Sequence, residues 1–275
     1  MRPRRLLRKL KGKGGGGGQG KHRAGFQEFS TSAIHEAILR ATEEVLPRDL
    51  TGKYLDLGSG KGELLSQVAT RFPALQSFAC DCTDTLMKRA NQKVEVADLN
   101  HESLPFGSDE FNLVTCSETL EHLENYWRVL REVFRVLRPG GVAVFTTPNI
   151  LNLRSRFRFF SSGFYNLFGP VMPDEKDVFS PRGHITPVSW FYLANALLSV
   201  GFQEVALTVD KYQRGSFLPF VLLSAPIRLS NRLALRREEK KFQTVGQKNA
   251  NTVRAINSTD LLLGRTLVVR ARKPA

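Results

Sequence analysis

The feature that most constrains this chain is a short apolar run that ends in a turn with glycine at every second position, Tyr54-Leu55-Asp56-Leu57-Gly58-Ser59-Gly60-Lys61-Gly62. Glycine adopts backbone conformations that other residues avoid, and it lets a ligand approach the main chain closely. This pattern is typical of a strand that delivers its carboxyl end to a small ligand. It also occurs as a simple tight turn in an α/β core.

Two other glycine-rich motifs are excluded by residue type. A P-loop requires glycine five positions before its Gly-Lys pair and a hydroxyl residue after it, but Leu55 and Gly62 occupy those places. A dinucleotide-binding fingerprint requires glycine or alanine where Glu63 stands. The turn therefore indicates a different ligand.

Acidic residues recur at the ends of three consecutive strand-like runs. Asp56 lies in the first run, Asp81 directly follows the run 75–80, and Asp98 directly follows the run 94–97. A helix-like stretch, 63–72, separates the first two runs, as expected for a strand-helix-strand unit. Three carboxylates at three successive strand ends favour a ligand site at one edge of a parallel sheet.

This arrangement resembles motif I and the following segments of class I S-adenosylmethionine-dependent methyltransferases. The resemblance implies that the glycine turn lies beside the methionine part of the cofactor. It also implies that Asp81 binds the ribose hydroxyls, while Asp98 and Leu99 contact the adenine. The implied cofactor-binding set is Asp56, Gly58, Ser59, Gly60, Gly62, Asp81, Cys82, Asp98, Leu99 and Ser117.

The predicted fold is an α/β, Rossmann-like, seven-stranded and mostly parallel sheet with helices on both faces. The remaining strands are expected at 111–116, 142–146, 202–209 and 265–272, with Gly140 and Gly141 forming the turn before the fifth. Two insertions, 150–185 and 213–260, follow strands 5 and 6. Residues 26–275 are expected to form one methyltransferase domain, with 41% hydrophobic composition typical of a globular chain.

A second candidate site lies in the segment 117–123, after the fourth strand. In a helical turn, Glu118 would face Glu121 and His122 at i+3 and i+4. Two carboxylates and an imidazole on one face suit a divalent cation such as Mg²⁺. The segment is similar to the Glu-x-x-Glu-His element of small-RNA 3′-end 2′-O-methyltransferases and of ubiquinone-biosynthesis O-methyltransferases. In the RNA enzymes a downstream histidine completes a metal site, so the resemblance implies the set Glu118, Glu121, His122 and His184.

The same segment has two other interpretations. His122 could act without a metal as a base or orienting group, or it could simply pack or cap, and His122 and His184 are the candidate catalytic residues. Methyl transfer from a sulfonium is an in-line displacement, and an acceptor hydroxyl needs a base or a cation because its pKa is high. This cluster therefore favours O-methylation.

The formal net charge of +14 is concentrated at the N-terminus, where residues 1–23 hold nine Lys or Arg and no acid. With five consecutive glycines, residues 1–25 are expected to form a disordered tail rather than a signal peptide. Such a tail suits nucleic acid, anionic lipid or solubility alone. Cys80, Cys82 and Cys116 fall at predicted strand ends and show no zinc or disulfide spacing, which favours small apolar roles in a reducing, cytoplasmic compartment.

The two insertions are the candidates for substrate choice. Residues 150–185 mix arginines with aromatic residues, which suits a lid over an anionic, glycan, lipid or nucleotide substrate or a small satellite core. A helix is expected to begin at Thr186-Pro187 and to end at Gly201. Residues 217–237 combine an apolar run with arginines, which suits either peripheral contact with the inner face of a membrane or docking on protein.

The sequence thus predicts a methyltransferase that O-methylates a small molecule, a lipid-linked intermediate or a glycan. An RNA 2′-O-methyltransferase is the alternative within the fold, although no RNA-binding module is recognisable. A non-catalytic cofactor-binding scaffold is the alternative from another class. Sequence patterns do not specify the oligomeric state.

Overall fold

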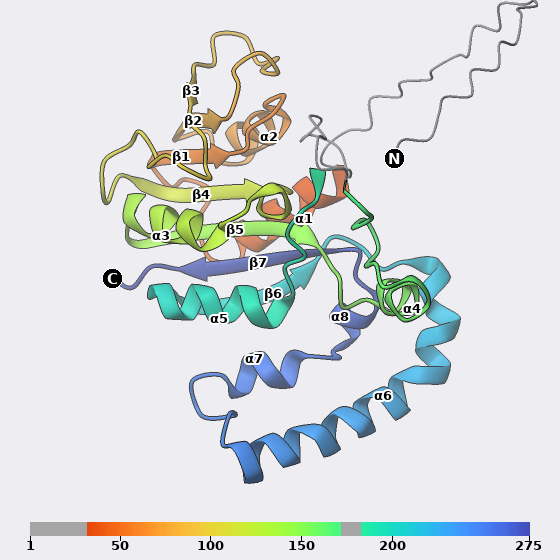
Figure 1. Ribbon diagram of the computed structural model, residues 1–275. Coiled ribbons are helices and arrows are strands. Elements are labelled where there is room, and N and C mark those ends of the chain that lie inside the picture. The colour runs from red at the N-terminus through yellow and green to blue at the C-terminus, as the bar shows by residue number, and fades with distance from the viewer. Residues whose placement is uncertain (1–31, 172–182) are drawn as a thin grey trace, which may run out of the picture.

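The computed structural model describes residues 32–171 and 183–275 (Figure 1). The basic tail predicted at residues 1–25 lies outside these residues, as does part of the first insertion. Within them, the chain forms one sheet with helices on both faces.

The sheet has seven strands in the order β3-β2-β1-β4-β5-β7-β6. β7 is antiparallel to both of its neighbours, and the other strand pairs of the described sheet are parallel. The predicted Rossmann-like, mostly parallel sheet is therefore confirmed. The strands are β1 (Gly52–Leu57), β2 (Leu75–Asp81), β3 (Val94–Val96), β4 (Phe111–Ser117), β5 (Leu137–Pro148), β6 (Gln203–Val209) and β7 (Thr266–Arg272).

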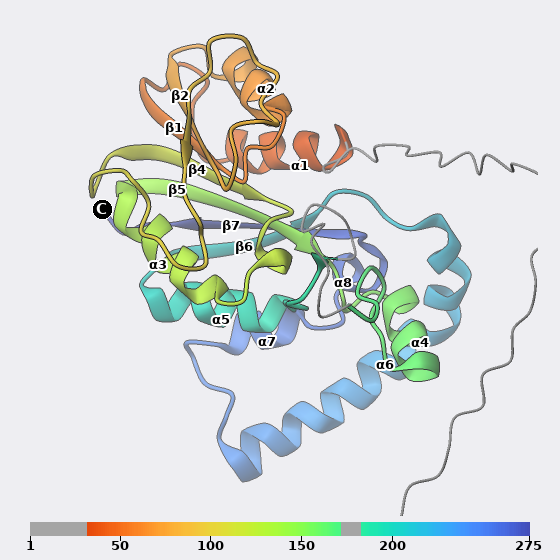
Figure 2. The ribbon, with the colours of Figure 1, turned by 45° about the horizontal axis from the view of Figure 1, so that its top comes forward.

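Two helical layers enclose the sheet, and each has its own apolar cluster. α1 (Ser32–Glu43) and α2 (Glu63–Arg71) pack on one face, around Tyr54, Leu65 and Val144. α3 (Tyr126–Val136) and α5 (Trp190–Val200) cover the other face, around Leu130, Phe145 and Leu197. Figure 2 shows these layers on opposite sides of the sheet. Because both faces are covered, most residues of the central strands β1, β4 and β5 are buried.

The order of the strands fixes where a ligand can bind. The chain runs outward from β1 through β2 to β3, then returns to β4 on the other side of β1. At such a reversal the loops leaving adjacent strands diverge, which opens a crevice beyond their carboxyl ends. The glycine turn after β1 and the segment after β4 both start at this crevice.

Two predicted boundaries were wrong. β5 begins at Leu137, so Gly140 and Gly141 lie inside an irregular strand, with Gly140 at φ 76° and a register shift against β4. α5 begins at Trp190 with Ser189 as its N-cap, since the Thr186 hydroxyl donates instead to the Leu123 carbonyl. Its predicted end at Gly201 is confirmed.

The insertions add helices beyond the sheet. The first contains α4 (Leu153–Ser162), and the second contains α6 (Phe217–Arg237), a π-helix at Glu238–Phe242, α7 (Ala250–Ala255) and α8 (Thr259–Leu263). α6 extends away from the sheet and buries none of its residues (Figure 1). Over the residues that the structure describes, no helix is both long and apolar enough to cross a membrane.

Candidate functional site

A cavity of about 320 Å³ lies at the carboxyl ends of β1, β2 and β4. It brings together most of the residues that the sequence predicted for the cofactor. Its lining is Gly58, Gly60, Asp81, Cys82, Leu86, Asp98, Leu99, Asn100, Glu118, Thr119, His122 and Leu123. Predicted cofactor residues from three strand ends therefore share one cavity with the predicted catalytic His122.

The glycine turn is tied to the end of β2 by main-chain donors. The Gly60 amide donates to Asp81 Oδ2 over 2.8 Å, and the Cys82 amide donates to Asp81 Oδ1 over 2.7 Å. Both oxygens of this buried carboxylate are thus fixed in place, and each retains a further lone pair for a ligand. Cys82 is exposed rather than buried, because β2 ends one residue before it.

Gly58 is a position in the turn where a side chain does not fit. Its φ is 68°, and an added Cβ would lie 2.2 Å from Thr119 Oγ1. The segment after β4 therefore packs directly against the turn after β1. Gly62, at φ 79°, precedes the first residue of α2 and does not line the cavity.

Asp56, Ser59 and Ser117 line a smaller cavity of about 50 Å³ that shares Gly58 with the first. The Thr115 hydroxyl donates to Asp56 Oδ1 over 2.6 Å. Burial raises the pKa of Asp56 to about 7 against the effect of this hydrogen bond, and the nearby Asp81 adds to the rise. The Asp56 carboxyl thus lies beside Gly58 and Ser59 of the glycine turn, in the lining of the smaller cavity.

Asp98 and Leu99 differ in exposure. Leu99 is buried, whereas the Asp98 side chain is 53% exposed and accepts hydrogen bonds from the Asn100 amide and from His101. The bond from His101 lowers the pKa of Asp98. Asp98 therefore offers an ionised carboxylate at the cavity rim, beside a buried apolar side chain.

The two predicted catalytic histidines lie side by side. Their ring centroids are 4.7 Å apart, with an interplanar angle of 77°. The segment 183–186 is held against the turn at Leu120–His122, because the amides of Ile185 and Thr186 both donate to the Glu121 carbonyl. This docking explains how a histidine far along the chain reaches His122.

Both imidazoles use Nδ1 in a hydrogen bond with a main-chain carbonyl. His122 Nδ1 lies 3.1 Å from the Gly183 oxygen, and His184 Nδ1 lies 3.0 Å from the Leu167 oxygen. Since a carbonyl only accepts, Nδ1 carries the proton and the lone pair of each neutral ring is on Nε2. Burial lowers the pKa of His184 to about 4, and the neighbouring His122 acts in the same direction.

Glu121 completes this cluster. Its side chain is fully buried, and neither carboxylate oxygen forms a hydrogen bond within the described residues. Burial raises its pKa, and the charge of Glu118 adds to this effect. One ligand atom each from Glu121, His122 and His184 lie within 4.8 Å of one another. An orphaned buried carboxylate beside two imidazole nitrogens fits a divalent cation.

Glu118 departs from the predicted helical turn. Only Leu120–His122 form a turn of 3₁₀-helix, and Glu118 precedes it with a left-handed backbone, φ 49°. Its carboxylate accepts a hydrogen bond from the Thr146 hydroxyl over 3.1 Å and lies outside the group of three ligand atoms. The predicted i+3 and i+4 geometry was therefore wrong.

Several lining residues were not predicted from the sequence. Thr119 and Leu123 lie in the segment that the Glu-x-x-Glu-His pattern had marked, and Asn100 directly follows Asp98-Leu99, so their neighbours carried a signal. Leu86 comes from an irregular segment after β2, and no motif there indicated it. Of the residues that line the smaller cavity, Lys61 lies within the glycine turn, so its neighbours carried a signal, whereas no site residue was predicted near His35.

Comparison with known proteins agrees with this geometry. Residues 55–145 match the family model described as Methyltransferase domain. The chain is 29% identical over 129 residues to 27-O-demethylrifamycin SV methyltransferase of Amycolatopsis mediterranei, covering 42% of this chain and 47% of that protein. It is 32% identical over 111 residues to the ubiquinone/menaquinone biosynthesis C-methyltransferase UbiE of Desulfotalea psychrophila. This match covers 37% of this chain and 44% of that protein. The chain thus spans about half the length of these curated relatives.

Solved structures share the fold over most of the chain. A methyltransferase from Archaeoglobus fulgidus, described as SAM dependent, superposes with a TM-score of 0.52 at 16% identity, covering 87% of this chain and 94% of that one. Phosphoethanolamine N-methyltransferase 2 of Haemonchus contortus, in complex with S-adenosyl-L-methionine, superposes with a TM-score of 0.50 at 17% identity. The match covers 87% of this chain and 53% of that one.

The fold and the cavity at its strand reversal define a methyltransferase domain of the S-adenosylmethionine-dependent type. Residues 55–145 match the Methyltransferase domain family, and the sheet that contains them has the fold of class I S-adenosylmethionine-dependent methyltransferases.

Proposed function

We propose that this chain transfers a methyl group to a hydroxyl oxygen of a small molecule, a lipid-linked intermediate or a glycan. The observation that supports O-methylation most strongly is the pair of adjacent imidazoles, His122 and His184, at the cofactor cavity. The two relatives named above are an O-demethylrifamycin methyltransferase and a C-methyltransferase, so they leave the acceptor atom open.

The cofactor is assigned to the cavity at Gly58, Asp81 and Leu99. In this proposal Asp81 accepts hydrogen bonds from the ribose hydroxyls, Leu99 packs on the adenine and Asp98 accepts from its amine. The glycine turn approaches the methionine part. When bound, the cofactor would supply a methyl group activated by its positively charged sulfur. The bond between this carbon and the sulfur would break as the acceptor oxygen bonds to the carbon, and the sulfur would leave as a neutral thioether.

His122 is proposed as the group that takes the proton of the acceptor hydroxyl. With Nδ1 bonded to the Gly183 carbonyl, the ring is fixed in the tautomer whose Nε2 lone pair can accept that proton. His184, neutral because of its lowered pKa, is proposed to orient His122 and to avoid electrostatic repulsion with it. Removing the proton makes the oxygen a better nucleophile.

As the alternative to that metal-free role, Glu121, His122 and His184 are proposed as ligands of a divalent cation, such as Mg²⁺. The support is the buried carboxylate of Glu121, which forms no hydrogen bond within the described residues, together with the grouping of the three ligand atoms. Such an ion would lower the pKa of the acceptor hydroxyl. Chelation separates this role from the metal-free one, since a metal-dependent enzyme loses activity and regains it with added Mg²⁺, while a metal-free enzyme is unaffected.

Peripheral contact with an anionic membrane surface is proposed for α6. Leu218, Leu222, Leu229 and Leu233 follow helical spacing, and each is more than half exposed. Arg228, Arg232, Arg236 and Arg237 lie on the same helix. An exposed apolar stripe with arginines beside it suits lipid headgroups.

The acceptor can be found with a labelled methyl donor. We expect the full chain to label an O-methylated product in fractions of a cell extract, and His122→Ala to lose this labelling while it still binds cofactor. Labelling of an amine, a carbon or an RNA 2′-hydroxyl would redirect the assignment. An absence of labelling despite cofactor binding would favour a non-catalytic scaffold.

A further inference from the structure

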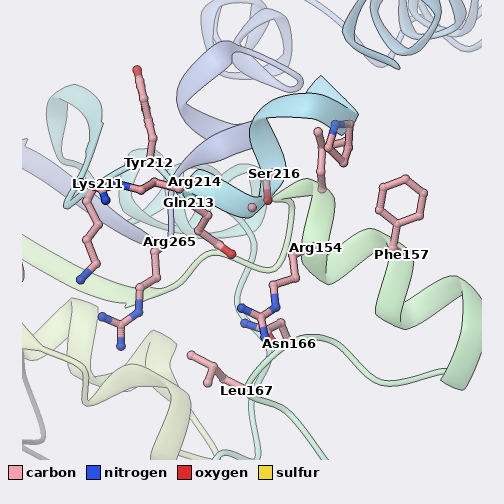
Figure 3. A pocket seen from close by; sticks show the side chains of 13 residues that line it. Arg154, Phe157, Asn166, Leu167, Lys211, Tyr212, Gln213, Arg214, Ser216 and Arg265 are labelled. Carbon is pink, nitrogen blue, oxygen red and sulfur yellow. The ribbon is translucent and has the colours of Figure 1, made fainter. Parts of the chain in front are cut away.

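A larger cavity, of about 910 Å³, lies between α4, the end of β6, the start of β7 and the start of α6 (Figure 3). Its lining comes from segments far apart in the sequence. The residues are Leu153, Arg154, Phe157, Asn166, Leu167, Lys211, Tyr212, Gln213, Arg214, Gly215, Ser216, Pro219 and Arg265.

This cavity is strongly cationic. Arg154, Lys211, Arg214 and Arg265 all line it, and no acidic residue is among the described residues of its wall. None of the four forms a salt bridge to a described residue, although arginines elsewhere, such as Arg71 and Arg135, do. Figure 3 shows Arg154 extending from α4 and Lys211 and Arg265 extending from the adjoining strand ends.

The four cationic side chains that line this cavity affect one another electrostatically. Like charges in one cavity repel each other, and a bound anion offsets that repulsion. Guanidinium groups also match the geometry of phosphate oxygens, to which they can donate two hydrogen bonds at once. The lining therefore suits an oxyanion more than a neutral ligand.

The cationic cavity adjoins the proposed acceptor site. Leu167 lines it and accepts the hydrogen bond from His184, whose ring contacts His122. Arg265 lies close enough to Glu118, in the wall of the cofactor cavity, for its charge to oppose the rise that burial causes in the pKa of that carboxyl. The contacts of Leu167 with His184 and of His184 with His122 thus link the walls of the two cavities.

We propose that this cavity binds a phosphate monoester or diphosphate group of the methyl acceptor and so holds its hydroxyl toward His122. This inference rests on the acceptor site proposed above and narrows the acceptor to phosphate-bearing compounds. Leu153, Phe157 and Pro219 add apolar surface to the same lining, where the chain of a lipid phosphate would fit.

Calorimetric titration of inorganic pyrophosphate into the full chain tests the proposal. We expect saturable binding that Arg154→Gln and Lys211→Gln each weaken about tenfold, the loss of one hydrogen bond to a charged group. Both side chains are exposed, so the variants should fold, and Arg154→Lys should recover part of the affinity. The control is Arg40→Gln, an exposed arginine on α1 outside the cavity.

The result that overturns the proposal is an absence of saturable binding, or equal weakening in Arg40→Gln. A second titration with dioctanoyl phosphatidic acid identifies the source of the phosphate. Tighter binding than pyrophosphate indicates a lipid acceptor, and equal binding indicates a polar one.

Pyrophosphate binding does not require methyl transfer, so the two proposals fail separately. A chain that O-methylates an acceptor but binds no pyrophosphate refutes the oxyanion site alone. A chain that binds pyrophosphate but methylates only carbon or nitrogen refutes the proposed function alone.

Discussion

His184 packs edge-on against His122, with ring centroids 4.7 Å apart, and is held there by its hydrogen bond to the Leu167 carbonyl. His184 does not line the cofactor cavity, whereas His122 does. A change at His184 should therefore affect the acceptor side of the reaction alone.

His184→Ala is expected to lower the rate of methyl transfer about 10²- to 10⁴-fold, the usual contribution of a positioned acid-base group. Binding of S-adenosylhomocysteine should stay within about twofold of the native chain, because no cofactor-cavity residue is removed. The measurement pairs product formation with calorimetry. An unchanged rate would assign His184 to packing only.

Asp56 should make stability depend on pH. Its pKa is raised by burial from 3.8 to about 7, so between these values the folded protein keeps a proton that the unfolded chain releases. The contribution of Asp56 to the free energy of unfolding is then greatest below pH 4 and is lost as the pH rises through 7.

The free energy of unfolding of the Asp56→Asn variant should fall less steeply over the same pH range, because the asparagine amide does not ionise. Denaturant unfolding at several pH values measures both profiles. Glu118 and Glu121, whose pKa values are also raised, remain in both proteins, so the difference reports on Asp56. Parallel profiles would show that this carboxyl does not hold its proton in the folded state.

Gly58→Ala should destabilise the protein and weaken cofactor binding. The added Cβ would meet the Thr119 hydroxyl in a residue that already has a positive φ. The matched control is Gly163→Ala, with a similar φ of 74° but open space around its Cβ. We expect the control to lose about 1–2 kcal/mol, the cost of a left-handed residue, and Gly58→Ala to lose more. Equal losses would mean that Thr119 moves aside freely.

Sequence patterns were informative where a local rule sets the structure. Buried strands that end in acids predicted the sheet and the cofactor cavity, because side chains at adjacent strand ends must lie together. The placement of His184 near His122 followed only from a resemblance in the order of motifs. Its physical cause, the docking of 183–186 on the Glu121 carbonyl, leaves no pattern in the sequence.

The predictions that were wrong failed where contacts between separate segments set the structure. Glu118 was placed in a helical turn by its spacing, but its left-handed backbone and its bond to Thr146 depend on the neighbouring strand. The helix expected at Thr186 begins later because that hydroxyl bonds to Leu123. The cationic cavity joins Arg154, Lys211 and Arg265 from three separate segments, so no window of sequence contains it.

The proposed membrane contact of α6 predicts selective binding to anionic lipid. The full chain should co-sediment with vesicles of phosphatidylcholine and phosphatidylglycerol, and less with phosphatidylcholine alone. Leu218→Gln combined with Leu222→Gln should reduce the bound fraction. Tyr192→Gln, at an equally exposed position on α5, is the control. Undiminished binding of the double variant would exclude α6 as the contact.

The central claim, that Asp81 and the glycine turn form the methyl-donor site, is tested most directly by calorimetric titration of S-adenosylmethionine. The native chain should bind one equivalent, and Asp81→Ala should weaken binding about tenfold to a hundredfold, because a charged acceptor for the ribose is lost. Asp84→Ala, an exposed acid outside the cavity, should bind like the native chain. Undiminished binding by Asp81→Ala would contradict the account.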